Sequence, residues 1–193
     1  MRRRALIVLV PMLAGLLVAG CGGGSDRTTG DGGGRSAVPS GTTSGASPSG
    51  ASPAASFDVP AVLRFRATTV EGGQFDAATL AGRPVVLWFW AAWCPRCAAA
   101  AGGIGELQSA NAGKVHVVGV AGLGSGAQPM RDFVSRHGIG GFPNLADDDG
   151  AVYRAFGVRA QDTYVILDAV GATVHKGPLA PAELHSRVTA LAG

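Results

Sequence analysis

The sequence is poor in the residues that build disulfide frameworks and basic surfaces. Of its 193 residues only three are cysteines and four are histidines, and 15% are charged. Three cysteines are too few for a framework of several disulfides. The formal charge of +3 equals the contribution of the three arginines at positions 2–4, so the rest of the chain is neutral. We therefore infer no nucleic-acid partner.

The sequence also lacks an apolar run of the roughly 20 residues that a transmembrane helix needs. The apolar segment Ala5–Ala19 follows the arginines and ends in Val18-Ala19-Gly20-Cys21. This pattern predicts a signal peptide over residues 1–20, and its end resembles the bacterial lipoprotein lipobox. The resemblance implies cleavage before Cys21, lipidation of its thiol, and anchoring in the cell envelope at the outer face of the plasma membrane. An ordinary secretory signal with an incidental Cys21 is the alternative.

Large aliphatic side chains are nearly absent from the next segment. Gly, Ser, Thr and Pro make up 25 of the 35 residues from Gly22 to Ser56, and Val38 is the only large aliphatic residue. Such a composition cannot bury enough apolar surface to offset the entropy of ordering. We therefore predict a disordered tether over residues 21–56 and a single folded domain over residues 57–193.

Within that domain, apolar runs alternate with helical patterns. The expected strands are Ala61–Val70 (one or two edge strands), Val85–Trp90, Val115–Gly122, Thr163–Asp168 and Ala172–Lys176. The expected helices are Ala98–Gly113, Pro129–His137, Gly150–Phe156 and Pro181–Leu191, with a helical turn at Ala77–Leu80. This order predicts an α/β fold, in which helices flank both faces of a central parallel or mixed β-sheet.

The two remaining cysteines, Cys94 and Cys97, follow the apolar run Val85–Trp90 within Trp-Cys-Pro-Arg-Cys. At a strand-to-helix turn, Cys94 would lie at the helix N-terminus, where free N–H groups and the helix dipole stabilise a thiolate. Pro95 suits the first helical turn, and Arg96 adds positive charge. This setting favours redox chemistry. A structural disulfide and a metal site remain alternatives, although zinc needs about four ligands and the sequence has no second Cys-x-x-Cys motif.

The segment Val85–Cys97 resembles the active-site strand and turn of the thioredoxin superfamily, in particular its extracytoplasmic TlpA- and DsbE-like members. The likeness continues through Val115–Gly122 and Phe142–Val158 and covers nearly all of residues 57–193. It implies a thioredoxin fold and a thiol–disulfide oxidoreductase, with Cys94 as nucleophile and Cys97 as resolving thiol. The implied partners are exported proteins with thiols or disulfides and a membrane redox partner. No metal and no organic cofactor is required.

The resemblance also implies a substrate groove around Trp93 and around Gln161 and Thr163. Between these last two residues the sequence departs from the pattern, because Asp162 occupies the position where family members carry a cis-proline. A cis bond before a non-proline residue costs about 2.5–4 kcal/mol. The Gln161–Asp162 bond is therefore expected to be trans in a reshaped loop, or else strained. A carboxylate near the thiols would raise a thiol pKa and oppose Arg96.

Two further departures bear on the direction of electron flow. Thioredoxin reductants have a buried Asp at the strand position that matches Trp88, and many relatives that reduce apocytochrome have a Glu at the helix position that matches Ala100. Without these acids the reduced dithiol is easier to form and the disulfide is more oxidising. We therefore expect an oxidase rather than a reductase. The alternative is a metal-binding or metal-delivery module, in which loss of the cis-proline exposes Cys94 and Cys97 to a soft metal.

Two other features have plainer interpretations. Trp90 is expected in the core beneath the cysteines. The acidic run Asp147–Gly150 lacks the longer ligand pattern of a calcium loop, so we interpret it as a solvated turn that ends in a helix cap.

Overall fold

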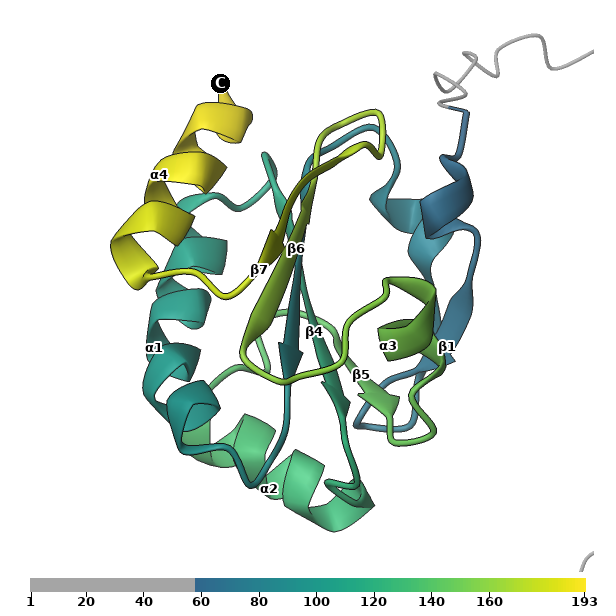
Figure 1. The fold of residues 1–193 in the computed structure, drawn as a ribbon, viewed down its shortest axis with the longest axis vertical. Helices are drawn as coiled ribbons and strands as arrows, with labels where there is room; N and C mark the ends of the chain where they lie inside the picture. The colour runs from purple at the N-terminus through teal and green to yellow at the C-terminus, as the bar shows by residue number, and fades with distance from the viewer. Residues whose placement is uncertain (1–57) are drawn as a thin grey trace, which may run out of the picture. The chain divides into compact units, whose positions relative to one another are not determined.

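The computed structural model describes residues 58–193 (Figure 1). The predicted signal peptide, the lipidation site Cys21 and the predicted tether lie outside the described residues. Among residues 58–193, no helix combines the length and the apolar character needed to cross a membrane.

The described chain forms a two-stranded and a five-stranded sheet with flanking helices. The strands are β1 (Arg66–Thr68), β2 (Gln74–Asp76), β3 (Val85–Trp90), β4 (His116–Gly122), β5 (Asn144–Asp147), β6 (Thr163–Leu167) and β7 (Thr173–Gly177). The α-helices are α1 (Pro95–Ala110), α2 (Ala127–His137), α3 (Ala151–Ala155) and α4 (Pro181–Ala192), and two short 3₁₀ helices are η1 (Ala61–Leu63) and η2 (Ala77–Leu80). The larger sheet has the order β5-β4-β3-β6-β7. Because β4 and β5 run parallel to β3, while β6 is antiparallel to both of its neighbours β3 and β7, it is a mixed sheet, as predicted.

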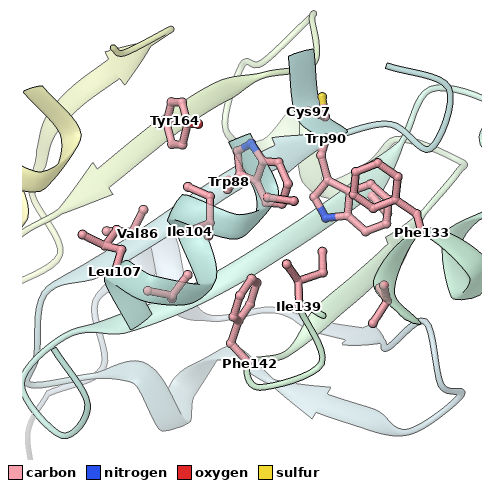
Figure 2. Packing of buried hydrophobic residues seen from close by; sticks show 14 of the residues in the cluster. Val86, Trp88, Trp90, Cys97, Ile104, Leu107, Phe133, Ile139, Phe142 and Tyr164 are labelled. Atoms are coloured by element: carbon pink, nitrogen blue, oxygen red, sulfur yellow. The ribbon is translucent and has the colours of Figure 1, made fainter. Parts of the chain in front are cut away.

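The central strand β3 is buried along its whole length. Its side chains alternate between two cores, since successive residues of a strand point to opposite faces. Val86, Trp88 and Trp90 pack into the core under α1, α2 and α4, which Figure 2 shows from close by. Val85, Leu87 and Phe89 pack against residues of η1, η2 and α3 on the other face. The predicted strand Val85–Trp90 and the helices on both faces are therefore confirmed (Figure 1).

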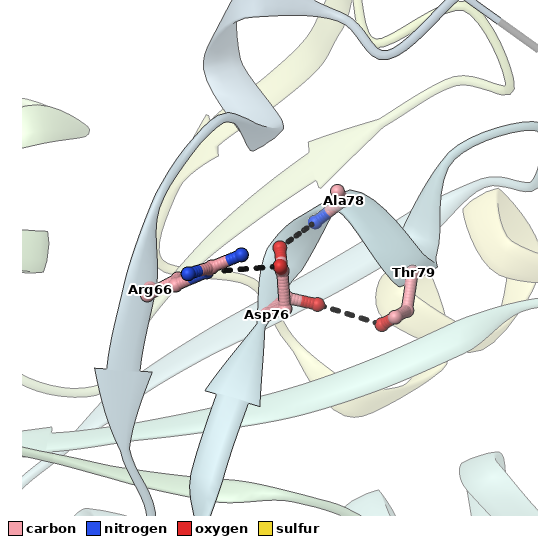
Figure 3. Close-up of polar contacts among 4 residues, drawn as sticks. All are labelled: Arg66, Asp76, Ala78 and Thr79. Carbon is pink, nitrogen blue, oxygen red and sulfur yellow. Dashed lines mark hydrogen bonds and ion pairs between the residues drawn. The ribbon is translucent and has the colours of Figure 1, made fainter.

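The first part of the domain differs from the prediction of edge strands over Ala61–Val70. Ala61–Leu63 form η1, because Leu63 N–H donates to the carbonyl of Pro60 and the turn buries the Leu63 side chain. Only Arg66–Thr68 form a strand, which pairs with the unpredicted strand β2 rather than with the larger sheet. Asp76 ends this hairpin: its carboxylate accepts hydrogen bonds from Arg66 and from the N–H of Ala78, and so caps η2 (Figure 3).

The strand β5 is also absent from the prediction. It is four residues long, and two of these, Asn144 and Asp147, are polar yet buried. Asn144 is satisfied by accepting a hydrogen bond from Trp90 Nε1 and donating to the carbonyls of Ile139 and Phe142. The interpretation of Asp147–Gly150 as a solvated turn is therefore wrong for Asp147. The N-cap residue Gly150 at the end of the run makes no side-chain hydrogen bond to α3, so the side-chain cap does not come from the predicted place.

Asp147 provides that cap, because its carboxylate accepts hydrogen bonds from the N–H groups of Val152 and Tyr153 in α3. Burial raises the pKa of this carboxyl, and the two backbone hydrogen bonds partly offset the effect. The cap fixes α3 against the end of β5, close to the carboxyl end of the sheet where β3 leads into the cysteines.

Candidate functional site

The cysteines lie at the carboxyl end of β3, at the turn into α1, as the sequence predicted. Both are free thiols. Cys94 is the N-cap of α1, with Pro95 as the first helical residue, and its Sγ accepts a hydrogen bond from the N–H of Cys97 over 3.1 Å. The Sγ atom of Cys94 therefore lies at the N-terminus of α1. The free N–H groups and the dipole at a helix N-terminus stabilise negative charge on an atom that caps it.

The two thiols have different surroundings. Cys94 is 3% exposed, and Cys97 is completely buried next to Trp90 in the core under α1 (Figure 2). Burial, followed by the hydrogen bond with Cys94, raises the pKa of Cys97 to about 12. Cys97 therefore stays protonated at neutral pH. Both thiols are thus buried, and they differ in position. Cys94, which we call the outer sulfur, caps α1, whereas Cys97, the inner thiol, lies within the helix and must lose a proton before it can react.

Hydrogen bonds hold the Trp93 side of the dithiol to the loop after β4. The N–H of Ala92 donates to Ser125 Oγ over 2.9 Å, and Ser125 Oγ donates to the carbonyl of Gly122 over 2.6 Å. Trp93 Nε1 donates to the carbonyl of Leu123 over 3.1 Å. The carboxylate of Asp148 then accepts from the N–H groups of Ser125 and Gly126, at 2.9 and 2.7 Å. We call Ala92, Trp93, Leu123, Ser125 and Asp148 the bonded side.

The sequence prediction included Trp93 but not Leu123, Ser125 or Asp148. Leu123 has a positive φ of 61°, which is uncommon for a residue with a branched side chain. Trp93 is 55% exposed and Leu123 36%. The hydrogen bond from Trp93 to the backbone of Leu123 thus joins two residues with exposed apolar side chains, next in sequence to Cys94 and at the end of β4.

Asp162 lies on the other side of the dithiol, directly before β6. Its Oδ2 is 3.7 Å from Arg96 Nε, and its Oδ1 accepts a long hydrogen bond of 3.5 Å from the hydroxyl of Tyr164. We call Arg96, Asp162 and Tyr164 the charged side. The predicted groove residues Gln161 and Thr163 flank Asp162, and both are partly buried.

The backbone of Asp162 explains why proline is missing there. Its φ is +56°, in the left-handed region. Proline is fixed near −65° and cannot adopt this conformation, whereas Asp is among the residues that tolerate it best. The loop is thus reshaped relative to one that would accept proline, and a carboxylate takes the place of a pyrrolidine ring.

The structure places the two positions that lack an acid on the same side of the sheet. Trp88 is fully buried in the core under α1, and its Nε1 has no hydrogen-bond partner among the described residues. Ala100 lines a cavity of about 240 Å³ together with Arg96, Ala99, Asp162, Tyr164, Leu179 and Pro181. The small alanine side chains of α1 leave this space open, and Asp162 is the carboxylate that borders it.

The donor set for a metal is incomplete within residues 58–193. No group of three or more His, Cys, Asp or Glu side chains in this part of the chain is arranged to hold a metal ion. A metal bound by Cys94 and Cys97 would therefore need further ligands from elsewhere.

Comparisons with known proteins agree with this fold and site. The family model described as the AhpC/TSA family matches residues 53–176. The chain is 40% identical over 133 residues to the soluble secreted antigen MPT53 of Mycobacterium tuberculosis, covering 67% of this chain and 75% of that protein.

Two solved structures from the same organism are similar. One is DsbF, described in mixed oxidised and reduced forms, at 41% identity and a TM-score of 0.65, covering 69% of this chain and 99% of DsbF. The other is described as a secreted disulfide oxidoreductase homologous to Escherichia coli DsbE, at 37% identity and a TM-score of 0.61, covering 67% of this chain and 98% of that one.

Proposed function

Because the chain belongs to the AhpC/TSA family of the thioredoxin superfamily, we propose that it is an extracytoplasmic thiol–disulfide oxidoreductase that works through Cys94 and Cys97. The observation that carries this proposal is the position of Cys94 Sγ, which caps α1 and accepts the N–H of Cys97. The relatives support it, since one is described as a secreted disulfide oxidoreductase and DsbF as existing in oxidised and reduced forms.

The reaction is a pair of thiol–disulfide exchanges. In the oxidising direction a substrate thiolate attacks Cys94 Sγ of the disulfide, and the Cys97 sulfur leaves with the electron pair. A second substrate thiolate then attacks the substrate sulfur of the mixed disulfide and releases the Cys94 thiolate. The substrate gains a disulfide, the protein becomes a dithiol, and no organic cofactor takes part.

We assign the direction as oxidation of exported proteins. Trp88 and Ala100 stand where a reductant would have an acid, and Arg96 places positive charge beside the thiols. Each of these features favours the reduced dithiol of the protein, which makes its disulfide a better oxidant. A membrane redox partner would then reoxidise the dithiol.

The apolar surface of Trp93 and Leu123 and the loop from Gln161 to Thr163 lie on opposite sides of the dithiol. We propose that an extended substrate segment lies between them, with its cysteine at Cys94. Export through residues 1–20 and lipidation of Cys21 would hold this site at the outer face of the plasma membrane. The mass of the membrane-extracted protein tests the anchor, because an unmodified Cys21 contradicts it.

A thiol count tests the redox proposal. The full chain, treated with oxidised glutathione, is expected to lose the free thiols of Cys94 and Cys97 and to gain no glutathione in mass, because Cys97 resolves the mixed disulfide. Treatment with reduced glutathione at a high ratio is expected to restore both thiols. A stable glutathione adduct, or thiols that do not cycle, would contradict the proposal.

A further inference from the structure

The inner thiol poses a chemical problem that the redox cycle must solve. Cys97 is completely buried, and burial raises its pKa to about 12. When the protein disulfide closes, Cys97 must lose a proton to attack Cys94. When the disulfide opens, Cys97 is the leaving group and must gain one. Bulk water does not reach this sulfur, so a group of the protein has to carry the proton.

An acidic side chain in β3 or α1 could carry this proton, but the two positions concerned are occupied by Trp88 and Ala100. Other ionisable groups near Cys97 are unsuited. Burial raises the pKa of both Tyr153 and Tyr164, so their hydroxyls remain protonated. The Tyr153 hydroxyl already donates to the carbonyl of Trp90 over 3.0 Å. Arg96 offers no acceptor atom for a proton.

Asp162 has the properties that the role requires. Its charge acts on Cys97, where it adds to the larger effect of burial. Its side chain is 17% exposed, so it is largely buried beside Arg96 and still in contact with solvent. Together with Arg96 and Ala99 of α1, it borders a cavity of about 240 Å³, which is large enough to hold water. Arg96 and Tyr164 hold its two oxygens at 3.7 and 3.5 Å.

We propose that Asp162 carries the proton of the inner thiol: its carboxylate accepts the proton of Cys97 as the disulfide closes and returns it as the disulfide opens. During closing, the S–H bond of Cys97 breaks and the proton passes to Asp162. The Cys97 sulfur bonds to Cys94 Sγ, and the substrate sulfur leaves with its electron pair. During opening the same steps run in reverse, so the Cys97 sulfur departs as a neutral thiol. This inference rests on the proposed function.

The closing step can be timed in the full chain with dithiobis(nitrobenzoate). Attack by Cys94 releases one coloured thionitrobenzoate, and attack by Cys97 on the resulting mixed disulfide releases a second one. The rate of the second phase does not depend on reagent concentration, so it isolates the step in which Cys97 loses its proton. The informative variant is Asp162→Asn, because Asn keeps the shape and also tolerates a positive φ.

We expect Asp162→Asn to slow the second phase about 100-fold, at the lower end of what a positioned acid or base contributes. A purely electrostatic role predicts the opposite sign. Removing a negative charge that raises the pKa of Cys97 would make the thiolate easier to form, and closing would become faster. An unchanged or faster second phase in Asp162→Asn would therefore overturn the inference.

Asp162→Gly provides an independent test, since glycine adopts the positive φ freely and leaves space for a small acid. We expect added formate to accelerate its second phase in proportion to formate concentration, and to leave Arg96→Gln unaffected. No acceleration by formate would also count against the inference. Failure of the proposed function looks different, because the wild type would then release no second thionitrobenzoate at all.

Discussion

The two sides of the dithiol are built in different ways. On the bonded side, Ala92 and Trp93 donate hydrogen bonds of 2.9 and 3.1 Å to Ser125 and Leu123 in the loop after β4. Asp148 accepts hydrogen bonds from the backbone of that loop. On the charged side, Asp162 is held only by contacts of 3.5 and 3.7 Å. The bonded side fixes the outer sulfur in place, whereas the charged side leaves a carboxylate free enough to exchange a proton. The bonded side thus positions the Cys94 sulfur, and the charged side transfers the proton of Cys97.

The strongest test of this division removes one sulfur at a time. In a chain whose Cys21 is blocked, Cys94→Ser should abolish the fast first release of thionitrobenzoate, because the remaining thiol, Cys97, is completely buried and its pKa is raised to about 12. Cys97→Ser should release one equivalent at close to the wild-type rate and then stop with a mixed disulfide on Cys94, which mass spectrometry detects. A fast first phase in Cys94→Ser would mean that the roles of the two sulfurs are reversed.

Breaking the bonded side should mainly reduce stability. Asp148→Ala removes two hydrogen bonds to a charged group, and we expect the free energy of unfolding to fall by about 1–3 kcal/mol. The shift of the urea midpoint measures this loss. Asp149→Ala is the control, because Asp149 is exposed and its carboxylate makes a 3.4 Å contact with the N–H of Ala151 and an interaction with the carboxyl of Asp147. Equal urea midpoints for the two variants would show that the hydrogen bonds of Asp148 do not stabilise the fold.

Substitutions that test the positive φ of Asp162 should change the free energy of unfolding less. Asp162→Gly is expected to keep or slightly raise stability, since glycine populates a positive φ without steric cost. Asp162→Pro is expected to destabilise the fold by more than about 1 kcal/mol, because the native φ is incompatible with the ring. A proline variant as stable as the wild type would show that the loop adopts the usual family conformation after all.

The pH dependence of stability provides a further test, which applies only at alkaline pH. Burial raises the pKa of Cys97 in the folded state from 9.0 to about 12. The unfolded state therefore loses the thiol proton first, and the free energy of unfolding of the reduced protein falls as the pH rises from about 9 towards 12. The loss is at most about 1.4 kcal/mol per pH unit. The difference between wild type and Cys97→Ser isolates it, and identical slopes would contradict it.

The sequence was sufficient where one pattern determines one structure. The continuous apolar run of β3 and the Cys-Pro-Arg-Cys turn predicted a buried strand and a helix with Cys94 at its N-terminus, and both are present. The complete burial of Cys97 was not predicted. The strand β5 was missed because its buried side chains at Asn144 and Asp147 are polar and break the apolar pattern. Their burial is possible only because Trp90, Ile139, Phe142 and the start of α3 supply hydrogen-bond partners.

The hydrogen bonds of the bonded side could not be predicted from the sequence, for a different reason. Ser125 and Asp148 are 23 residues apart, and they meet only because the carboxyl ends of parallel strands lie at one edge of the sheet. Asp162 was identified from its place in the family pattern, but its positive φ and its contact with Tyr164 were not. Short-range patterns predicted the elements, and the pairing of the strands determined the walls of the site.

The reduction potential of the Cys94–Cys97 pair decides whether the protein is an oxidase, a reductase or neither. The full chain is equilibrated with glutathione buffers of stepped ratio, and the oxidised fraction is read by mass after the free thiols are blocked. We expect a single reversible two-electron transition with a potential nearer the about −120 mV of DsbA than the about −270 mV of thioredoxin. A potential close to that of thioredoxin would contradict the assignment as an oxidase, and a pair that does not cycle would contradict the redox function itself.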